Sequence, residues 1–298
     1  MTAGRAFAAG IAGGAVVVAL IVLLTSGGGG DSAAPVKSGD AKAPTTTTEK
    51  TGAARPSAPP PATGSYRGPV PILMYHVVKA PAPGTPQAEL WVPAGTFRRT
   101  IADLKEAGYT GVTMEQVHAA WNGGPGLPAK PVVVSFDDGY LSHYEAAMPI
   151  LRKAGWPGVL NLKTGNIDPK GGIAPWQVKA LVAAGWEIGA HSITHADLTT
   201  LDAAGLDREV AGSRKELEKE FGVKVNTFCY PAGKYDAEAE QAVKRAGFTT
   251  ATTVDPGVAS PKDNPLLLPR VRVNGSDSPQ AVLERVRTGA GATGGGYG

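Results

Sequence analysis

Helix-like and strand-like stretches alternate along the middle of the chain. Apolar residues recur with helical spacing in five segments, at residues 97–107, 142–154, 175–184, 202–220 and 236–246. Short runs that favour β-structure flank these segments, at residues 71–75, 132–134, 186–188, 225–228 and 271–273. Strands that alternate with helices predict an α/β fold built on a parallel sheet.

A short repeat marks the boundaries between these elements. Ala-Gly followed by an aromatic residue occurs four times, with the glycines at Gly108, Gly155, Gly185 and Gly247. Glycine adopts the left-handed conformation that ends many helices at little steric cost. We therefore expect a helix to end at each glycine and a strand to begin near each aromatic residue.

The predicted units extend over residues 66–289, and their number fits a distorted (β/α) barrel better than a small open sheet. An open, doubly wound sheet is the alternative. No Gly-x-Gly-x-x-Gly sequence follows a predicted strand, so nothing supports a nucleotide partner. In a barrel of this kind, functional residues lie where the strands end and the loops begin.

The chain outside this domain has a different composition. Residues 7–24 form one apolar stretch, so residues 1–25 are expected to be a signal peptide or a membrane anchor. Residues 26–65 are rich in Pro, Thr and Gly and predict a disordered linker, and residues 290–298 predict a disordered tail. Together they predict an extracellular domain, either secreted or anchored to the outer face of the cytoplasmic membrane.

Charge and cysteine content narrow the possible partners. The formal net charge is +3, and basic residues are interleaved with acidic ones, which argues against a nucleic-acid partner. Cys229 is the only cysteine, so neither an intrachain disulfide nor a Cys-x-x-Cys metal or redox site is possible.

Two acidic residues follow the strand predicted at 132–134. Asp137 and Asp138 come at its end, and Gly139 then allows a tight turn. Two adjacent carboxylates can converge on one site where the chain turns. The alternative is that they cap the next helix.

Two histidines follow another predicted strand. His191 and His195 are four residues apart, a spacing that places both on one face of a helical turn. Two imidazoles and one carboxylate form a catalytic zinc site with a position open for water, and the same ligands also accept cobalt or nickel. One aspartate would then bind the ion, and the other would accept a proton from the water.

A glycosidase with paired carboxylates is a rival interpretation. That reaction requires two carboxyl groups about 5–10 Å apart on either side of the scissile bond. The adjacent Asp137 and Asp138 suit a shared metal ion better.

The segments SFDDG (135–139) and HSITH (191–195) resemble the first two motifs of the polysaccharide deacetylase family, carbohydrate esterase family 4, with its NodB-homology domain. The resemblance covers roughly residues 70–275. It implies a distorted (β/α) barrel that removes N-acetyl groups from N-acetylhexosamine polysaccharides, or O-acetyl groups in some members. It also implies Asp137 as the general base and Asp138, His191 and His195 as metal ligands.

The family's third motif is altered in this chain. Cys229 occupies the position that usually holds arginine, and Tyr230-Pro231-Ala232-Gly233 resembles the branch that includes poly-N-acetylglucosamine deacetylases. The resemblance implies that the backbone N–H of Tyr230 contributes to an oxyanion hole. Cys229 is expected to be a small buried hydrophobic residue. Three residues are candidates for substrate binding: Tyr140, Pro231 and Ala232.

The family's usual C-terminal general-acid histidine is missing, because no histidine follows His195. His76, at the end of the first predicted strand, is the candidate replacement, and a core histidine is the alternative. Arg270 is expected to take the place of the missing arginine and to pair with Asp137, with a surface salt bridge as the alternative. His143 is expected at the surface.

The motifs do not distinguish between two candidate substrates, peptidoglycan and a secreted exopolysaccharide. Two other functions remain as alternatives. One is an O-acetyl esterase that acts on xylan or another polysaccharide with the same scaffold. The other is a non-catalytic protein that binds the cell wall.

Overall fold

The computed structural model describes residues 64–168 and 172–289, and the fold is analysed within these ranges. The predicted signal peptide or anchor, most of the linker and the predicted C-terminal tail lie outside them. None of the helices in the described part of the chain is both long and apolar enough to cross a membrane.

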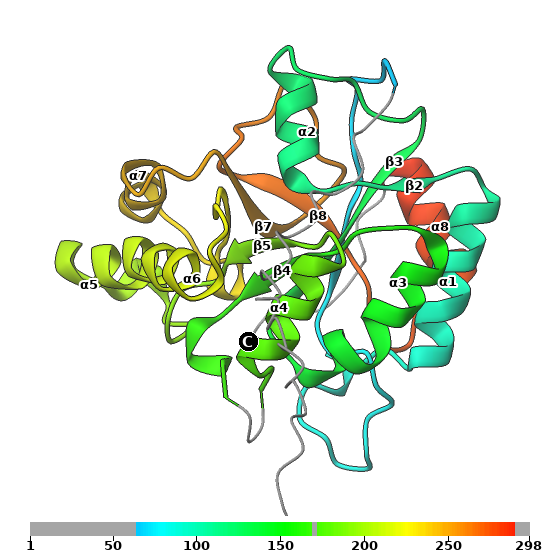
Figure 1. The fold of residues 1–298 in the computed structure, drawn as a ribbon, viewed down its shortest axis with the longest axis horizontal. Coiled ribbons are helices and arrows are strands. Elements are labelled where there is room, and N and C mark those ends of the chain that lie inside the picture. Colours follow the sequence, from blue (N-terminus) through cyan, green and yellow to red (C-terminus); the bar gives the residue numbers. More distant parts are fainter. Residues whose placement is uncertain (1–63, 169–171, 290–298) are drawn as a thin grey trace, which may run out of the picture. The chain divides into compact units, whose positions relative to one another are not determined.

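The described residues form a parallel β-barrel with helices around it (Figure 1). The sheet order is β1-β8-β7-β6-β5-β4-β3-β2, and β1 also pairs with β3. Seven strands therefore form a closed ring, and β2 lies outside it against the first residues of β3. The strands are β1 Ile72–Tyr75, β2 Thr110–Gly111, β3 Pro131–Asp138, β4 Val159–Leu162, β5 Glu187–Ala190, β6 Thr227–Cys229, β7 Thr250–Pro256 and β8 Leu268–Arg272. The predicted barrel is confirmed, and the closure through β1 excludes the open doubly wound sheet.

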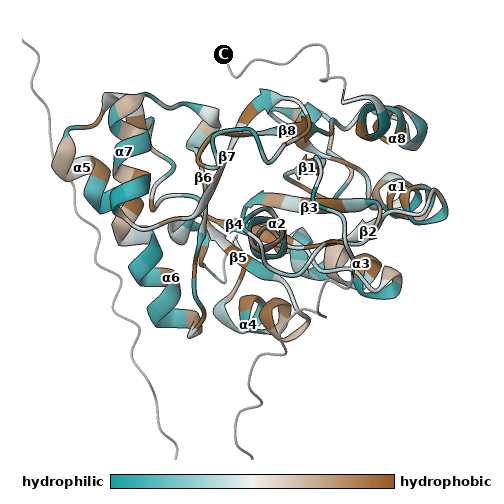
Figure 2. Ribbon diagram, turned by 90° about the horizontal axis from the view of Figure 1, so that it is seen from above, coloured by the Kyte–Doolittle hydropathy of each residue, from teal (hydrophilic) through white to brown (hydrophobic). Residues whose placement is uncertain are grey.

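Helices surround the ring, as the view from above shows (Figure 2). They are α1 Ala94–Glu106, α2 Met114–Trp121, α3 Met148–Ala154, α4 Pro175–Ala183, α5 Ala203–Asp207, α6 Ser213–Phe221, α7 Ala237–Arg245 and α8 Pro279–Thr288. Two π-helical turns extend them: η2 (His143–Ala147) leads into α3, and η5 (Arg208–Gly212) joins α5 to α6. The sequence patterns at 97–107, 142–154, 175–184, 202–220 and 236–246 correspond to these helices within a few residues.

The repeated Ala-Gly-aromatic sequence has the predicted role. Gly108, Gly155, Gly185 and Gly247 all have positive φ, between 76° and 86°, and follow the ends of α1, α3, α4 and α7. A strand begins within a few residues of each aromatic residue. The repeat therefore fixes where four of the helices end and the chain returns to the barrel.

Apolar packing closes one end of the barrel. The helix α2 lies over that end (Figures 1 and 2), where Met114 and Val117 pack with Ile72, Val133 and Val159 from the strands. A capping box in which Thr113 and Gln116 bond each other's backbone N–H fixes the start of α2. Because α2 covers this end, the functional residues are expected at the opposite end, where the carboxyl ends of the strands lie.

Candidate active site

A pocket of about 260 Å³ opens at the carboxyl ends of the strands. Nine of the ten residues that the sequence nominated for the site line it: His76, Asp137, Asp138, Tyr140, His191, His195, Tyr230, Ala232 and Arg270. Gln87, Leu90, Lys234 and Val254 complete the lining. Pro231 is buried and is not part of the lining.

Asp138, His191 and His195 form a cluster that could hold a metal ion. Their candidate ligand atoms lie within 4.8 Å of one another. Asp138 Oδ1 is 3.7 Å from His191 Nε2 and 3.9 Å from His195 Nε2. One carboxylate oxygen and two imidazole nitrogens suit zinc, cobalt or nickel, so the donor set fits the predicted ion.

The loop from His191 to His195 differs from the helical turn expected for this spacing. Ser192 and His195 have positive φ, at 59° and 66°, and the segment is not helical. The Ser192 Oγ accepts a hydrogen bond of 2.9 Å from the His195 N–H, which closes the loop. The two rings meet edge to face, with centroids 4.8 Å apart, because of this loop and not because of helical periodicity.

Backbone strain is concentrated at the pocket. Five non-glycine residues in the described part of the chain have positive φ. Four of them line the pocket, and the fifth lies within the histidine loop: Gln87, Asp138, Ser192, His195 and Ala232. Such conformations are unfavourable by about 1–3 kcal/mol each and persist where surrounding contacts enforce them.

Glu209, which the sequence analysis did not nominate, braces the histidine loop. Its Oε2 accepts hydrogen bonds from the backbone N–H groups of Ile193 and Thr194, each at 2.9 Å, and its Oε1 accepts one from Thr194 Oγ1. The side chain is only 4% exposed and extends from the π-helical turn η5. Its three bonds hold the backbone between the two histidines.

Asp137 is buried, and three polar side chains lie around its carboxylate. Arg270 forms a two-pronged ion pair with it, at 2.9 Å from Nη1 to Oδ1 and 2.8 Å from Nη2 to Oδ2. Asn161 Nδ2 donates to Oδ1 at 2.8 Å, and His76 Nε2 lies 3.9 Å from Oδ2. Arg270 is 1% exposed, so the predicted pairing with Asp137 is present and the surface salt bridge is excluded.

The charges around Asp137 decide its ionisation. Burial raises the pKa of this carboxyl, but Arg270, His76 and His191 together outweigh burial and hold the pKa well below its ordinary range. Asp137 is therefore charged at neutral pH. An ionised carboxylate next to a metal cluster can accept a proton from water.

His76 and His143 form a pair at the end of β1. His76 follows the strand directly and lines the pocket, and burial lowers its pKa. His143 was expected at the surface, but this was wrong: it is fully buried, and its Nε2 bonds the backbone carbonyl of His76. Burial also lowers the pKa of His143, to about 4. The neutral ring, with Nε2 as the donor, holds the backbone of His76.

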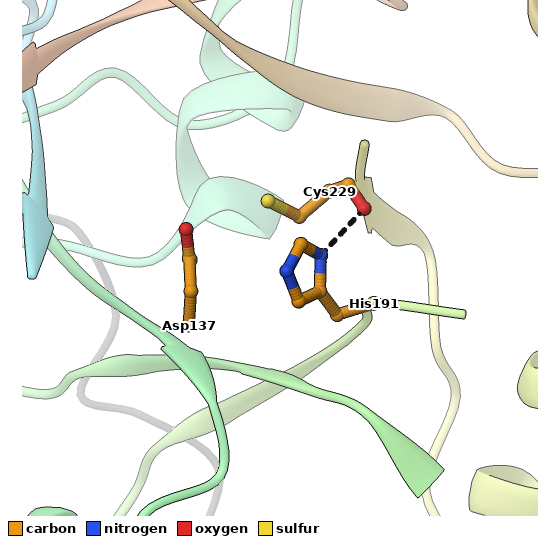
Figure 3. A group of neighbouring side chains, drawn as sticks. All are labelled: Asp137, His191 and Cys229. Carbon is orange, nitrogen blue, oxygen red and sulfur yellow. Dashed lines mark hydrogen bonds between the residues drawn. The ribbon is translucent and has the colours of Figure 1, made fainter. Parts of the chain in front are cut away.

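A second cluster shares His191 with the first. Asp137, His191 and Cys229 also bring candidate ligand atoms within 4.8 Å of one another (Figure 3). The contacts argue against a cation there, because Arg270 already pairs with Asp137 and donates to Cys229 Sγ at 3.3 Å. His191 Nδ1 bonds the Cys229 carbonyl oxygen at 2.7 Å, which directs Nε2 toward Asp138.

The nominated oxyanion donor is engaged elsewhere. The backbone N–H of Tyr230 donates to the Thr252 carbonyl oxygen at 3.1 Å, as part of the pairing between the ends of β6 and β7. The N–H predicted for the oxyanion hole is thus a sheet donor in this structure. Ala232, two residues further on, has a φ of 51° and lines the pocket.

Comparisons with known proteins agree with this geometry. Residues 125–251 match the family model described as polysaccharide deacetylase. The Bacillus subtilis protein YxkH is 29% identical over 205 residues, which cover 69% of this chain and 71% of that protein. The poly-beta-1,6-N-acetyl-D-glucosamine N-deacetylase of Escherichia coli is 44% identical over 87 residues, which cover 29% of this chain and only 13% of that enzyme.

Solved structures share the fold. The Streptococcus pyogenes deacetylase PplD, in complex with acetate, matches with a TM-score of 0.69 and 27% identity over 72% of this chain and 97% of that one. The Bacillus cereus polysaccharide deacetylase BC0361 matches with a TM-score of 0.66 and 26% identity over 73% of this chain and 69% of that one. Over residues 125–251 this chain therefore matches the polysaccharide deacetylase family of enzymes, and its barrel has the fold of solved deacetylases.

Proposed function

We propose that this chain is a metal-dependent hydrolase that removes N-acetyl groups from an N-acetylhexosamine polysaccharide. The observation that carries the proposal is the juxtaposition of two groups at the same pocket. One is the cluster of Asp138, His191 and His195, and the other is the buried, ionised Asp137. Together they supply a place for a divalent ion and a base beside it.

The residues present divide the reaction between them. Asp138, His191 and His195 would hold the ion, which when bound supplies a Lewis acid that lowers the pKa of water and polarises the acyl carbonyl. Asp137 accepts the proton of the attacking water. As the C–N bond breaks, His76 donates a proton to the departing amine, and acetate and a free amino sugar are the products. The lowered pKa of His76 makes its protonated ring a stronger acid for this step.

Two observations favour an N-acetyl over an O-acetyl substrate. An amine leaves less readily than an alcohol and needs a proton, and His76 lies 3.9 Å from the base, where it can supply one. The similarity to the N-deacetylase of Escherichia coli points to a β-1,6-linked N-acetylglucosamine polymer. The apolar residues 7–24 support a site of action outside the cytoplasmic membrane, where such polymers lie.

The test is acetate release from β-1,6-linked N-acetylglucosamine oligomers by the full chain, after the metal is removed and then zinc is restored. Asp137→Asn should retain zinc and lose activity. Asp138→Asn should lose both. Asp207→Asn makes the same chemical change in an exposed surface ion pair and is the matched control. Undiminished zinc affinity in Asp138→Asn would overturn the proposed ligands.

Substrate class is tested in parallel with intact peptidoglycan and acetylated xylan. Faster release from xylan than from both N-acetylated substrates would favour the O-acetyl esterase. Zinc binding without acetate release from any of the three would favour the non-catalytic alternative.

A further inference from the structure

Asn161 lies in the same layer of the barrel as the base. The strand register pairs Asp137 of β3 with Asn161 of β4, and Asn161 with Gly189 of β5. Residues that are in register on neighbouring parallel strands point to the same face of the sheet. Asn161 therefore projects into the barrel beside Asp137, from a strand whose other residues are apolar, and it is 1% exposed.

The contact between the two side chains has a defined direction. Asn161 Nδ2 is 2.8 Å from Asp137 Oδ1, the oxygen that also accepts from Arg270 Nη1 at 2.9 Å. The amino end of the amide faces the carboxylate because its carbonyl end would be repelled by the negative charge. With two donors on Oδ1, rotation of the carboxylate is opposed, and Oδ2 stays on the side of His76.

The other end of the amide is not satisfied. Asn161 Oδ1 is buried and has no hydrogen-bond partner among the described residues. A buried polar atom without a partner destabilises a fold, so a leucine at this position would suit the strand better. The asparagine is thus better explained by what it does for Asp137 than by stability.

Gly189 provides the space that Asn161 occupies. A Cβ added at this glycine would lie 2.5 Å from Asn161 Oδ1 and 3.3 Å from the Thr227 carbonyl oxygen. Gly189 is not among the residues with positive φ, so backbone conformation does not require glycine there. Its missing side chain instead leaves room for the amide.

We propose that Asn161 is a positioning residue for Asp137, and that Gly189 is required because it makes room for Asn161. The amide fixes Oδ1, so that Oδ2 remains the oxygen that takes the proton. This inference rests on the proposed hydrolysis and adds to it a residue outside the two acid–histidine motifs.

The test uses the full-length zinc enzyme with Asn161→Leu and Asn161→Ala. We expect kcat to fall about 10- to 100-fold with KM within twofold, because the substitutions disturb the base and leave substrate binding intact. Zinc content should be unchanged. Thr252→Val is the matched control: its buried hydroxyl also has no hydrogen-bond partner within residues 64–168 and 172–289, and kcat should stay within twofold.

A second pair of variants separates positioning from a general effect on folding. Gly189→Ala should lower kcat in the wild-type background, because its methyl group displaces the amide. In the Asn161→Ala background the same change should have a much smaller effect, because only the 3.3 Å contact with the Thr227 carbonyl oxygen remains. Thermal unfolding of each variant checks that the domain is folded.

The outcomes are distinguishable. An active wild type with an unaffected Asn161→Leu variant overturns the inference alone. A loss confined to KM, or equal losses from Gly189→Ala in both backgrounds, also overturns it. A wild type that releases no acetate from any substrate overturns the proposed function, and this inference with it.

Discussion

Asp137 keeps its charge while only 2% of its side chain is exposed, and Arg270 is the main reason. The guanidinium also donates to the Thr253 carbonyl oxygen and to Cys229 Sγ, so its own position is fixed. The arginine is thus supplied from β8, and the small Cys229 at the end of β6 leaves room for it and accepts one of its hydrogen bonds.

Arg270→Met should destabilise the protein by about 3–5 kcal/mol, because it leaves a buried carboxylate without its cation. Chemical denaturation would measure this change. Combining it with Asp137→Leu should recover most of the stability, since a buried pair can be replaced by apolar residues, while acetate release stays absent. If Arg270→Met alone were as stable as wild type, the role given to the ion pair would be contradicted.

Sequence alone could nominate the residues at strand ends, because a motif and a strand boundary are both local features. Asp137, Asp138, His191, His195 and His76 were found in this way, whereas Arg270 was nominated to replace the arginine missing from the family's third motif. Glu209 and Asn161 were missed because their roles depend on partners that fold next to them. His143 was misplaced because histidine is usually exposed, whereas here it lies on the same helical face as the buried Ala147 and Leu151 and bonds the His76 carbonyl oxygen.

At the scale of elements, the long periodic segments were predictable and the short ones were not. The five helical segments and five of the strands follow from their patterns. The strand β4 was missed because an asparagine interrupts its four residues, and β7 because it is rich in threonine. Helix α8 has ten residues and was not predicted.

The π-helical turn η5 is the element that positions the histidine loop. Glu209→Ala removes three hydrogen bonds to Ile193 and Thr194, so the loop should become less ordered. We expect zinc affinity to fall about 10- to 100-fold, as for other residues that orient metal ligands. Competition with a chelator would measure it, and Glu216→Ala on the exposed side of α6 is the control. Unchanged affinity would show that the loop holds its shape without Glu209.

At the scale of the whole molecule, the barrel places the candidate active site and the apolar packing under α2 at opposite ends. The pocket occupies the carboxyl end of the strands, and α2 covers the other end. Near that covered end, the half-buried Glu187 accepts hydrogen bonds from Thr227 Oγ1 and from the Glu115 N–H at the start of α2. Burial raises the pKa of Glu187 from 4.5 to about 7, in spite of these bonds.

This raised pKa predicts a pH-dependent stability. The folded protein binds the Glu187 proton more tightly than the unfolded chain does. Protonated Glu187 therefore adds to the free energy of unfolding fully below pH 4.5, and this stabilisation is lost as the pH rises through about 7. Between pH 5 and 8, wild type should lose about 1–2 kcal/mol more stability than Glu187→Gln, with allowance for partial screening by water. Urea denaturation at both pH values measures this, and Glu216→Gln on the exposed side of α6 is the control. Equal losses would refute the assignment.

The closure of the ring through β1 determines when the site is completed during synthesis. The pocket draws on residues from His76 to Arg270, nearly the whole length of the folded domain. Until β8 has emerged from the ribosome, β1 has only β3 as a neighbour, and Asp137 lacks its guanidinium. A carboxylate without a partner resists burial, so the seam stays open until the last strand arrives. A chain that stops short of β8 therefore has neither a closed sheet nor a paired base, and the site cannot be completed before β8 has been synthesised.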